Sequence, residues 1–416
     1  MKRKWLIAGP LILIELALCG AIVGLSWASV AQARVGGFSW RLFSADTVSA
    51  EADDSQTFTV AGPATLTVKN TAGNVTVIGG TGHEIVVDMH KMAWGADQAD
   101  ANNQLARLTV NMTQTGNAVS VQVEPPIEVD LIHIGPGSAF VIFTITVPAD
   151  TAVTVGNDFG NVTLSDTQGD VDLQTNSGKV RATEVNGDAT LNSDFGDVIL
   201  SNASAGNVDA HSNAGNITLT DVQAGGDVLL ESDFGVIEFE RGTAESLTVT
   251  TNSGKVTLAS VTVGSVVDVQ NDFGNITLTD VDAASYDVHT NSGDITITGA
   301  SGAVTAHSDF GDVTVTNAEE VTLDLKTNAG TVTFSGSLGI GPHTLTSDFG
   351  NVRLTLPADS ALTIDLKTDF GKITSALPIT ASGELDDHWQ GTINGGGASL
   401  TVKTNSGNIS LDLLNP

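Results

Sequence analysis

The tripeptide Asp-Phe-Gly, whose aspartate binds magnesium in protein kinases, occurs in the stretch NSDFGDVILSN at residues 192–202. A kinase site also requires a Gly-rich phosphate loop, a strand lysine and a His-Arg-Asp catalytic loop, and none of these accompanies the tripeptide. The tripeptide occurs seven times, ending at Gly160, Gly196, Gly235, Gly274, Gly311, Gly350 and Gly371. One chain does not need seven copies of a catalytic loop, so the tripeptide predicts a structural repeat.

The aspartates of these turns could instead bind calcium through their oxygen atoms. The candidate ligands are Asp194, Asp233, Asp272 and Asp309. The Gly-Gly-x-Gly-x-Asp nonapeptide of calcium-binding β-rolls does not occur in the sequence. Calcium therefore remains an alternative to a purely structural role, and no other cofactor is expected.

Two histidines could form a transition-metal site. His289 and His307 each stand four residues before a turn glycine, so we expect them side by side on adjacent coils, with His211 farther away. Neighbouring imidazoles can share a metal ion, but two ligands do not complete a site. An exposed polar column is the simpler interpretation.

An enzymatic function must also be considered, because polysaccharide lyases and hydrolases use parallel β-helices. Such enzymes need acid and base groups that converge in a groove. The least regular polar stretch contains Asp386, Asp387 and His388, but neighbouring residues in one loop do not form a positioned dyad. We expect Trp389 to pack under a C-terminal cap, and we predict that the chain is not an enzyme.

The residues that position these side chains belong to a repeat. Turn glycines recur at spacings of 18 to 21 residues. They are Gly160, Gly178, Gly196, Gly215, Gly235, Gly254, Gly274, Gly293, Gly311, Gly330, Gly350 and Gly371, and Gly73 and Gly407 begin the same pattern outside that block. A fixed period of this length predicts a solenoid.

Apolar residues keep fixed positions around each glycine, seven and five before it and two and four after it. Val208, Ala210, Ile217 and Leu219 surround Gly215 in this way. A period of two on both sides of a turn predicts two short strands per coil of about 19 residues, each with one buried face. We expect a parallel β-solenoid with right-handed connections, whose twelve consecutive coils stack ~4.8 Å apart and span roughly 50 Å.

The turns alternate between Asp-Phe-Gly and Asn-Ser-Gly or Asn-Ala-Gly. Carboxylates on every coil would lie ~4.8 Å apart and repel each other. Alternation separates the carboxylates, permits Asp-to-Asn hydrogen bonds and places Phe beside Ser or Ala. The sequence predicts one break in this order, where Asp348 and Asp369 fall on neighbouring coils.

A flat array of threonines is expected on one outer wall, as in ice-binding solenoids. The residues are Thr277, Thr279, Thr296, Thr298, Thr314 and Thr316, followed by Thr333 and Ser335. Threonine is also an ordinary solvent-facing strand residue. Ice or crystal-surface binding is thus an alternative function, and Arg181, Ile199, Glu238 and Arg353 interrupt the column.

Composition limits the partners of this chain of 416 residues. It carries 48 acidic and 17 basic residues, a net charge of -31 at pH 7. Such a charge repels nucleic acid and anionic membrane surfaces, and it favours cations, neutral glycans or basic proteins. Cys19 is the only cysteine, so no disulfide can form within the chain.

The segment 1–34 begins with three basic residues and continues with an apolar run long enough to cross a bilayer. It predicts a signal-anchor that leaves the rest of the chain outside the cytoplasm. The alternative is a signal peptide cleaved near AQA at residues 31–33, which would release the protein. We further expect a β-rich cap with a short helix at 45–150, the regular array at 151–375 and a second cap at 376–416 that ends in a last repeat.

The stretch VPAD, the Gly-centred strand repeats and the closing segment GTINGGGASLTVKTNSGNISL resemble the bacterial β-strand-repeat domain of unknown function that carries a candidate-adhesin label. The resemblance covers residues 55–416 and implies a β-solenoid outside the cytoplasmic membrane, without catalytic residues. We therefore predict a non-enzymatic surface solenoid, an adhesin or interaction scaffold, whose partner is a glycan or an envelope protein. The alternative is an envelope-stress or regulatory protein that binds a membrane partner.

Overall fold

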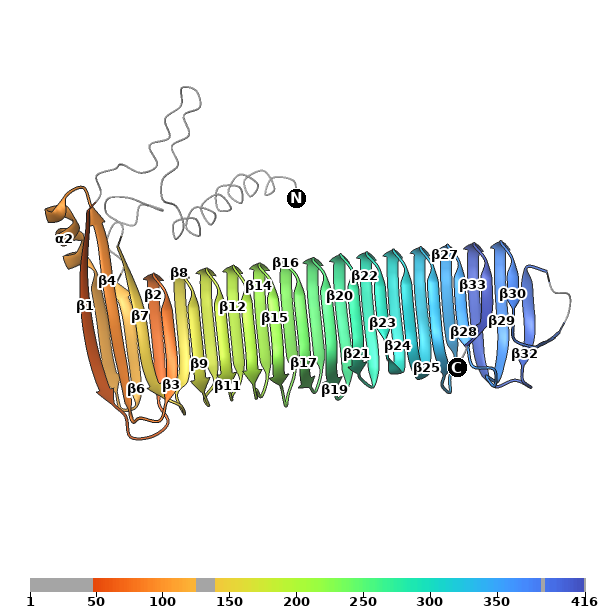
Figure 1. Cartoon of the computed structure of the whole chain (residues 1–416), viewed down its shortest axis with the longest axis horizontal. Helices are drawn as coiled ribbons and strands as arrows, with labels where there is room; N and C mark the ends of the chain where they lie inside the picture. The colour runs from red at the N-terminus through yellow and green to blue at the C-terminus, as the bar shows by residue number, and fades with distance from the viewer. Residues whose placement is uncertain (1–47, 125–138, 383–385, 415–416) are drawn as a thin grey trace, which may run out of the picture.

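The computed structural model describes residues 48–124, 139–382 and 386–414, which form one long β-structure (Figure 1). The predicted signal-anchor at 1–34, with Cys19, lies outside the described residues. Within the described ranges, no helix is both long enough and apolar enough to span a bilayer.

The chain winds between two parallel walls, as the period predicts. Wall 1 contains, in stacking order, β7 (Ala139–Pro148), β3 (Val75–Gly80), β9 (Val162–Thr167), β11 (Val180–Val185), β13 (Val198–Ala203), β15 (Ile217–Gln223), β17 (Ile237–Ala244), β19 (Val256–Val263), β21 (Ile276–Asp282), β23 (Ile295–Thr298), the first half of β25 (Val313–Ala329), β26 (Val332–Leu338), β28 (Val352–Leu356), β34 (Ile409–Leu413) and β30 (Ile373–Ser375).

Wall 2 faces it and contains, in the same order, β6 (Ala118–Glu124), β2 (Thr65–Ala72), β8 (Ala152–Phe159), β10 (Val171–Ser177), β12 (Ala189–Phe195), β14 (Val208–Ala214), β16 (Val228–Phe234), β18 (Leu247–Ser253), β20 (Val266–Phe273), β22 (Ser285–Ser292), β24 (Ser301–Phe310), the second half of β25, β27 (His343–Phe349), β33 (Ala398–Ser406) and β29 (Leu362–Phe370).

The core lies between the walls and consists of the apolar positions that the repeat predicts. Val208 and Ala210 of β14 and Ile217 and Leu219 of β15 are at most 1% exposed. Each strand pairs with its counterpart one coil away, so Leu219 stacks between equivalent residues of neighbouring coils. The parallel solenoid with two strands per coil is therefore confirmed, whereas its right-handed sense stays a prediction.

Glycine is required at the turn for two reasons, which Gly274 illustrates. Its φ of +143° is rarely adopted by other residues. A Cβ built on it would also collide with the backbone oxygen of Gly254 in the adjacent coil. The turn glycines thus stack backbone against backbone, which leaves no room for a side chain.

Wall 1 contains a bend that the strand pattern does not predict. In eight coils, a residue other than glycine adopts a positive φ just before the chain leaves this wall. In most of these coils the next residue turns a third apolar side chain inward, as Val222 does after Asp221. The residues of this bend column are Asp166, Glu184, Asn202, Asp221, Arg241, Ser260, Asp280 and Asn317, at φ between 50° and 63°.

The last repeat is inserted between earlier coils, which corrects the predicted coil order. Strand β33 pairs with β27 on one side and with β29 on the other, and β34 likewise lies between β28 and β30. The run of sequential coils therefore ends at Gly350, and the prediction of twelve consecutive coils was wrong. Asp348 and Asp369 are not on neighbouring coils, because the coil of Asn405 separates them.

The same arrangement occurs at the other end. The coil formed by β2 and β3 lies between β6/β7 and β8/β9. At both ends the chain passes over the inserted coil through a Pro-Ala-Asp turn, closed by hydrogen bonds of 3.1 Å from Thr151 N to Pro148 O and from Ser360 N to Pro357 O. The two similar sequences 144–160 and 353–371 thus perform the same topological step.

Antiparallel strands cover both ends of the stack. At the N-terminal end β1 (Val48–Thr59) pairs with β4 (Glu84–Gly95), β4 with β7, and β5 (Thr109–Thr115) with β6. Helix α2 (Gln98–Arg107), capped by Asp97, packs on β4 and β1. At the other end β32 (His388–Ile393) pairs with β29 and with β31 (Ile379–Ala381). Exposed Glu51, Asp53 and Asp54 discourage further strand pairing at the β1 edge.

Candidate interaction surface

A regular column of phenylalanines runs along the corner where each coil leaves wall 2. The seven residues of this Phe column are Phe159, Phe195, Phe234, Phe273, Phe310, Phe349 and Phe370. Six of them are exposed, from 46% for Phe159 to 79% for Phe370. Phe195 is half-buried. Large apolar side chains exposed along one line mark a surface that is suited to contact a partner.

The Phe column keeps strict alternation in space because the inserted coil restores it. Phe349 pairs with Ala329 on one side and with Ser406 on the other, and Ser406 also pairs with Phe370. At the N-terminal end, Phe159 lies between Ala72 and Ser177. Each phenylalanine is therefore two layers, ~9.6 Å, from the next.

Beside the Phe column runs an Asp–Asn column with regular hydrogen bonds. In each pair the Asn Nδ2 donates to Oδ1 of the Asp on the preceding layer, at 2.7 to 3.3 Å. The pairs are Asn176 with Asp158, Asn213 with Asp194, Asn252 with Asp233, Asn291 with Asp272, Asn328 with Asp309 and Asn405 with Asp348. The predicted Asp-to-Asn bonding is thus present along the stack.

The calcium candidates Asp194, Asp233, Asp272 and Asp309 occupy alternate layers of this column, and each accepts an Asn amide. In the described ranges, no three His, Cys, Asp or Glu side chains gather in a way that could hold a metal ion. Calcium binding stays a prediction. At the N-terminal end, burial raises the pKa of the Asp158 carboxyl above its ordinary value.

A buried hydroxyl ladder, which the sequence reasoning missed, ties the coils together beneath the corner. Three residues before the glycine, a buried Ser or Thr donates to the carbonyl oxygen of the turn glycine one coil earlier. Ser193 bonds Gly178 O at 2.9 Å and Thr327 bonds Gly311 O at 2.8 Å. Thr251 occupies the same position, but its hydroxyl has no partner. The recurrence of Ser, Thr or Asn at this position was the available signal.

The bend column carries charge on adjacent layers. The Arg241 guanidinium donates to both carboxylate oxygens of Asp221, at 2.8 and 3.0 Å, and this bonding lowers the pKa of the Asp221 carboxyl. Glu184 lies next to Asp166, and the hydrogen bond and repulsion between the two carboxyls raise the pKa of Glu184. This edge is therefore irregular in charge, unlike the Asp–Asn column.

The predicted threonine array lies in register on wall 1. Thr277, Thr296 and Thr314 pair in one row, and Thr279, Thr298 and Thr316 pair in the next. The hydroxyls of Thr298 and Thr316 are 3.3 Å apart, within hydrogen-bonding distance. Arg353 continues the first row after Thr333. Ice or crystal-surface binding by this face stays a prediction.

The two histidines are neighbours on wall 2, as expected. Their ring centroids are 5.0 Å apart. His289 Nε2 lies 2.8 Å from Asp287 Oδ1, and His307 Nε2 lies 3.6 Å from Asp324 Oδ1. Each ring thus faces a carboxylate of its own rather than a shared central point.

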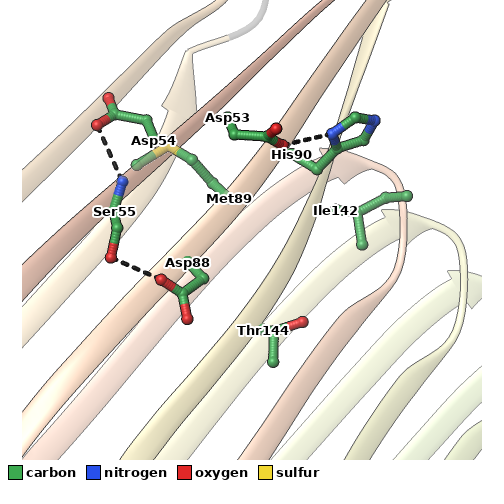
Figure 2. Close-up of a pocket in the computed structure, with 8 residues that line it drawn as sticks. All are labelled: Asp53, Asp54, Ser55, Asp88, Met89, His90, Ile142 and Thr144. Carbon is green, nitrogen blue, oxygen red and sulfur yellow. Dashed lines mark hydrogen bonds and ion pairs between the residues drawn. The ribbon is translucent and has the colours of Figure 1, made fainter.

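The outer face of β1, β4 and β7 has an open depression of ≈ 440 Å³ (Figure 2). His90 Nδ1 lies 2.7 Å from Asp53 Oδ1, and the Ser55 hydroxyl donates to Asp88 at 2.6 Å. The serine is therefore bonded to a carboxylate and not to the imidazole. A nucleophile activated by a base needs the opposite arrangement.

In the polar stretch near the C-terminal cap, His388 pairs with a carboxylate outside the stretch rather than with Asp386 or Asp387. His388 bonds Asp365 of the neighbouring strand at 2.6 Å, and Trp389 Nε1 donates to the backbone oxygen of Asp386. Trp389 is half-buried against the core, as expected. Asp386 and Asp387 are exposed.

The sequence profile of the Toastrack DUF4097 family matches residues 64–238 and 236–412. The chain belongs to this family. The two matches meet near the middle of the stack, so this Toastrack chain contains two successive copies of the family pattern, each with a Pro-Ala-Asp turn and an inserted coil at its outer end. No curated protein is similar to the chain in sequence.

Several solved structures have similar chains. A candidate adhesin from Parabacteroides merdae is 12% identical, with 67% of this chain and 95% of that chain covered and a TM-score of 0.33. A candidate adhesin from Parabacteroides distasonis is 11% identical, with 86% and 97% covered and a TM-score of 0.29. A candidate cell adhesion protein from Clostridium sporogenes is 8% identical, with 87% and 100% covered and a TM-score of 0.20.

Proposed function

We propose that this Toastrack chain is a non-enzymatic interaction solenoid on the outer side of the cytoplasmic membrane, held there by its N-terminal segment. It presents a stiff acidic rod to a surface or to an envelope protein. The observation that carries this proposal is the Phe column, which places a phenylalanine on every second layer along the rod and exposes six of the seven.

The corner itself does not require phenylalanine. The intervening layers form the same glycine turn with Ser or Ala in the equivalent position, as Ser253 and Ser292 do on either side of Phe273. An exposed phenyl ring gains little from folding, because most of its surface remains in water. Contact with a partner is a reason to keep it.

Attachment of the full-length chain to intact bacterial cells, measured by fluorescence, tests the proposal. The test variant replaces Phe234, Phe273 and Phe310 with serine. A matched control replaces Ser253 and Ser292 with alanine. We expect the Phe variant to lose attachment and the control to retain it, with equal melting temperatures for all three proteins. Equal attachment by the Phe variant would refute the proposal. Repeating the assay with calcium and with a chelator tests the Asp–Asn column for calcium.

A further inference from the structure

We infer that the corner formed by the Phe column and the Asp–Asn column binds an extended, linear glycan of equatorially linked hexoses, neutral or amine-bearing, laid along the axis of the stack. This inference rests on the proposed function and names the class of partner. Neither column suffices alone. Together they place an apolar ring face and a polar group side by side at a regular interval along the stack.

The period of the corner requires a partner that is itself periodic. Phe234, Phe273 and Phe310 repeat every two layers, ~9.6 Å. In an extended hexose chain with equatorial links, each sugar advances the chain by close to one strand spacing. Successive sugars are turned over, so every second sugar presents the same face. A ring on every second layer therefore meets the same sugar face each time.

The chemistry of the corner also fits a sugar. The C–H face of a pyranose is apolar and packs on an exposed aromatic ring, while its hydroxyls need acceptors and donors nearby. Asp233, Asp272 and Asp309 are exposed, and their bonds to asparagine use only Oδ1. The second carboxylate oxygen of each keeps its lone pairs for a hydroxyl or an ammonium group.

Charge and hydrogen bonding argue against the other extended partners. A net charge of -31 and a carboxylate beside each phenylalanine oppose polyanions, including nucleic acid and uronic-acid glycans. A lipid bilayer would have to take the carboxylates into its interface together with the rings, which is costly. A polypeptide strand would need free backbone groups, but the turn amides are already bonded, as Gly274 N is to Ser292 O.

Binding at a repeated site predicts a dependence on glycan length. Each ring and carboxylate supplies a weak contact, and contacts along one chain combine through effective concentration. Affinity should therefore rise in steps of two sugars. An amine-bearing chain should bind more tightly than its acetylated counterpart at low salt, because the ammonium groups meet carboxylates.

The test is calorimetric titration of the full-length chain with β-1,4-linked N-acetylglucosamine oligomers from the dimer to the octamer and with their deacetylated forms. Amylose oligomers, which are α-linked and coil, serve as the ligand control. The variant Phe273→Ser/Phe310→Ser should weaken octamer binding about tenfold or more, as the loss of two stacking contacts predicts. Ser253→Ala/Ser292→Ala should leave it unchanged.

The other outcomes overturn the inference. Octamer binding that survives the Phe substitutions would place the glycan elsewhere. Equal affinity for amylose would show that the spacing of the Phe column does not select the glycan. If no oligomer binds but the Phe substitutions still abolish attachment to cells, the proposed function stands and the partner is not this glycan. If no oligomer binds and the Phe substitutions also leave attachment to cells unchanged, both proposals are rejected.

Discussion

The side-chain amide of Asn405 donates a hydrogen bond of 3.2 Å to Oδ1 of Asp348, which lies 57 positions earlier in the chain. This bond joins the last repeat to a coil that was completed long before it in the sequence. It continues the Asp–Asn column without a break, and Ser406 next to it continues the spacing of the Phe column.

Replacing Asn405 with aspartate should destabilise the protein because it places a carboxylate between those of Asp348 and Asp369. We expect a loss of about 1 kcal/mol at low salt that shrinks as salt rises, since exposed charges are screened. Urea unfolding at two salt concentrations measures it. Asn405→Ser is the control, because it removes the same bond without adding charge, so its effect should not depend on salt. Equal salt dependence of the two variants would contradict the column.

Replacing Gly274 with valine should cost about 3 kcal/mol or more, because the side chain would meet the backbone of Gly254 and the positive φ would be strained. Thr277→Ser, three residues later on the outer face of the same coil, should change stability little. Thermal unfolding of both variants measures the difference. Equal melting temperatures would show that the assigned register of the turn is wrong.

Replacing Thr327 with valine should cost about 1 to 2 kcal/mol, because it removes the hydroxyl that donates to Gly311 O at 2.8 Å in a buried position. The matched variant Thr251→Val removes a buried hydroxyl that has no partner. It should be neutral or stabilising. Denaturant titration of the two variants measures how much one bond of the hydroxyl ladder contributes to the free energy of unfolding. Equal losses of stability in the two variants would argue against that ladder.

His343 predicts a dependence of stability on pH. It is 1% exposed, its Nδ1 accepts from Leu323 N, and its Nε2 donates to Gly339 O. Burial lowers the pKa of His343 below its ordinary 6.5. The fold therefore holds neutral imidazole, and the unfolded chain takes up a proton first as pH falls. Stability that is present above pH 6.5 should be lost as pH falls below it.

The variant His343→Leu should lack this pH-dependent contribution to stability. Its unfolding free energy, relative to that of the parent protein, should therefore rise as the pH falls from 7 to 5. Unfolding free energies across this range measure it. His83→Gln, at an exposed position, is the control and should follow the parent protein. A constant difference between His343→Leu and the parent at every pH would show that His343 is not the group responsible.

Much of the solenoid could be predicted from the sequence because its causes are local. The inward positions of Val208, Ala210, Ile217 and Leu219 follow from the period of two around one glycine. The bonds between Asn252 and Asp233 or Asn291 and Asp272 follow from the alternation of turn types. Both depend only on coils that succeed one another in the chain.

The position of the last coil could not be predicted in this way. The sequence of residues 398–413 has the pattern of one more repeat. Its position in the stack depends on pairing with strands β27 and β29, which lie far from it in the sequence, and its own residues do not indicate those partners. One signal was present. The two aspartates Asp348 and Asp369 broke the alternation in sequence, and the only further Asn-Ser-Gly turn beyond them was the one at Asn405.

The bend column was missed for another reason. Glu184 and Arg241 adopt positive φ, although asparagine, aspartate and glycine are the residues that usually do so. Their conformation follows from stacking on the coils above and below, which local preference does not reveal. The exposure of the Phe column was likewise visible only in three dimensions, since a phenylalanine in a repeat could equally face the core.

Disulfide trapping can establish the coil order on which the continuous Phe column depends. In a background with Cys19→Ser, the pair Phe349→Cys and Ser406→Cys should form a disulfide under mild oxidation, because these residues are direct partners on adjacent strands. The pair Phe349→Cys and Phe370→Cys should not, because a whole layer separates them. Efficient bonding of the second pair and not the first would mean that the coils stack in sequence order, and it would contradict both the inserted coil and the alternating surface built on it.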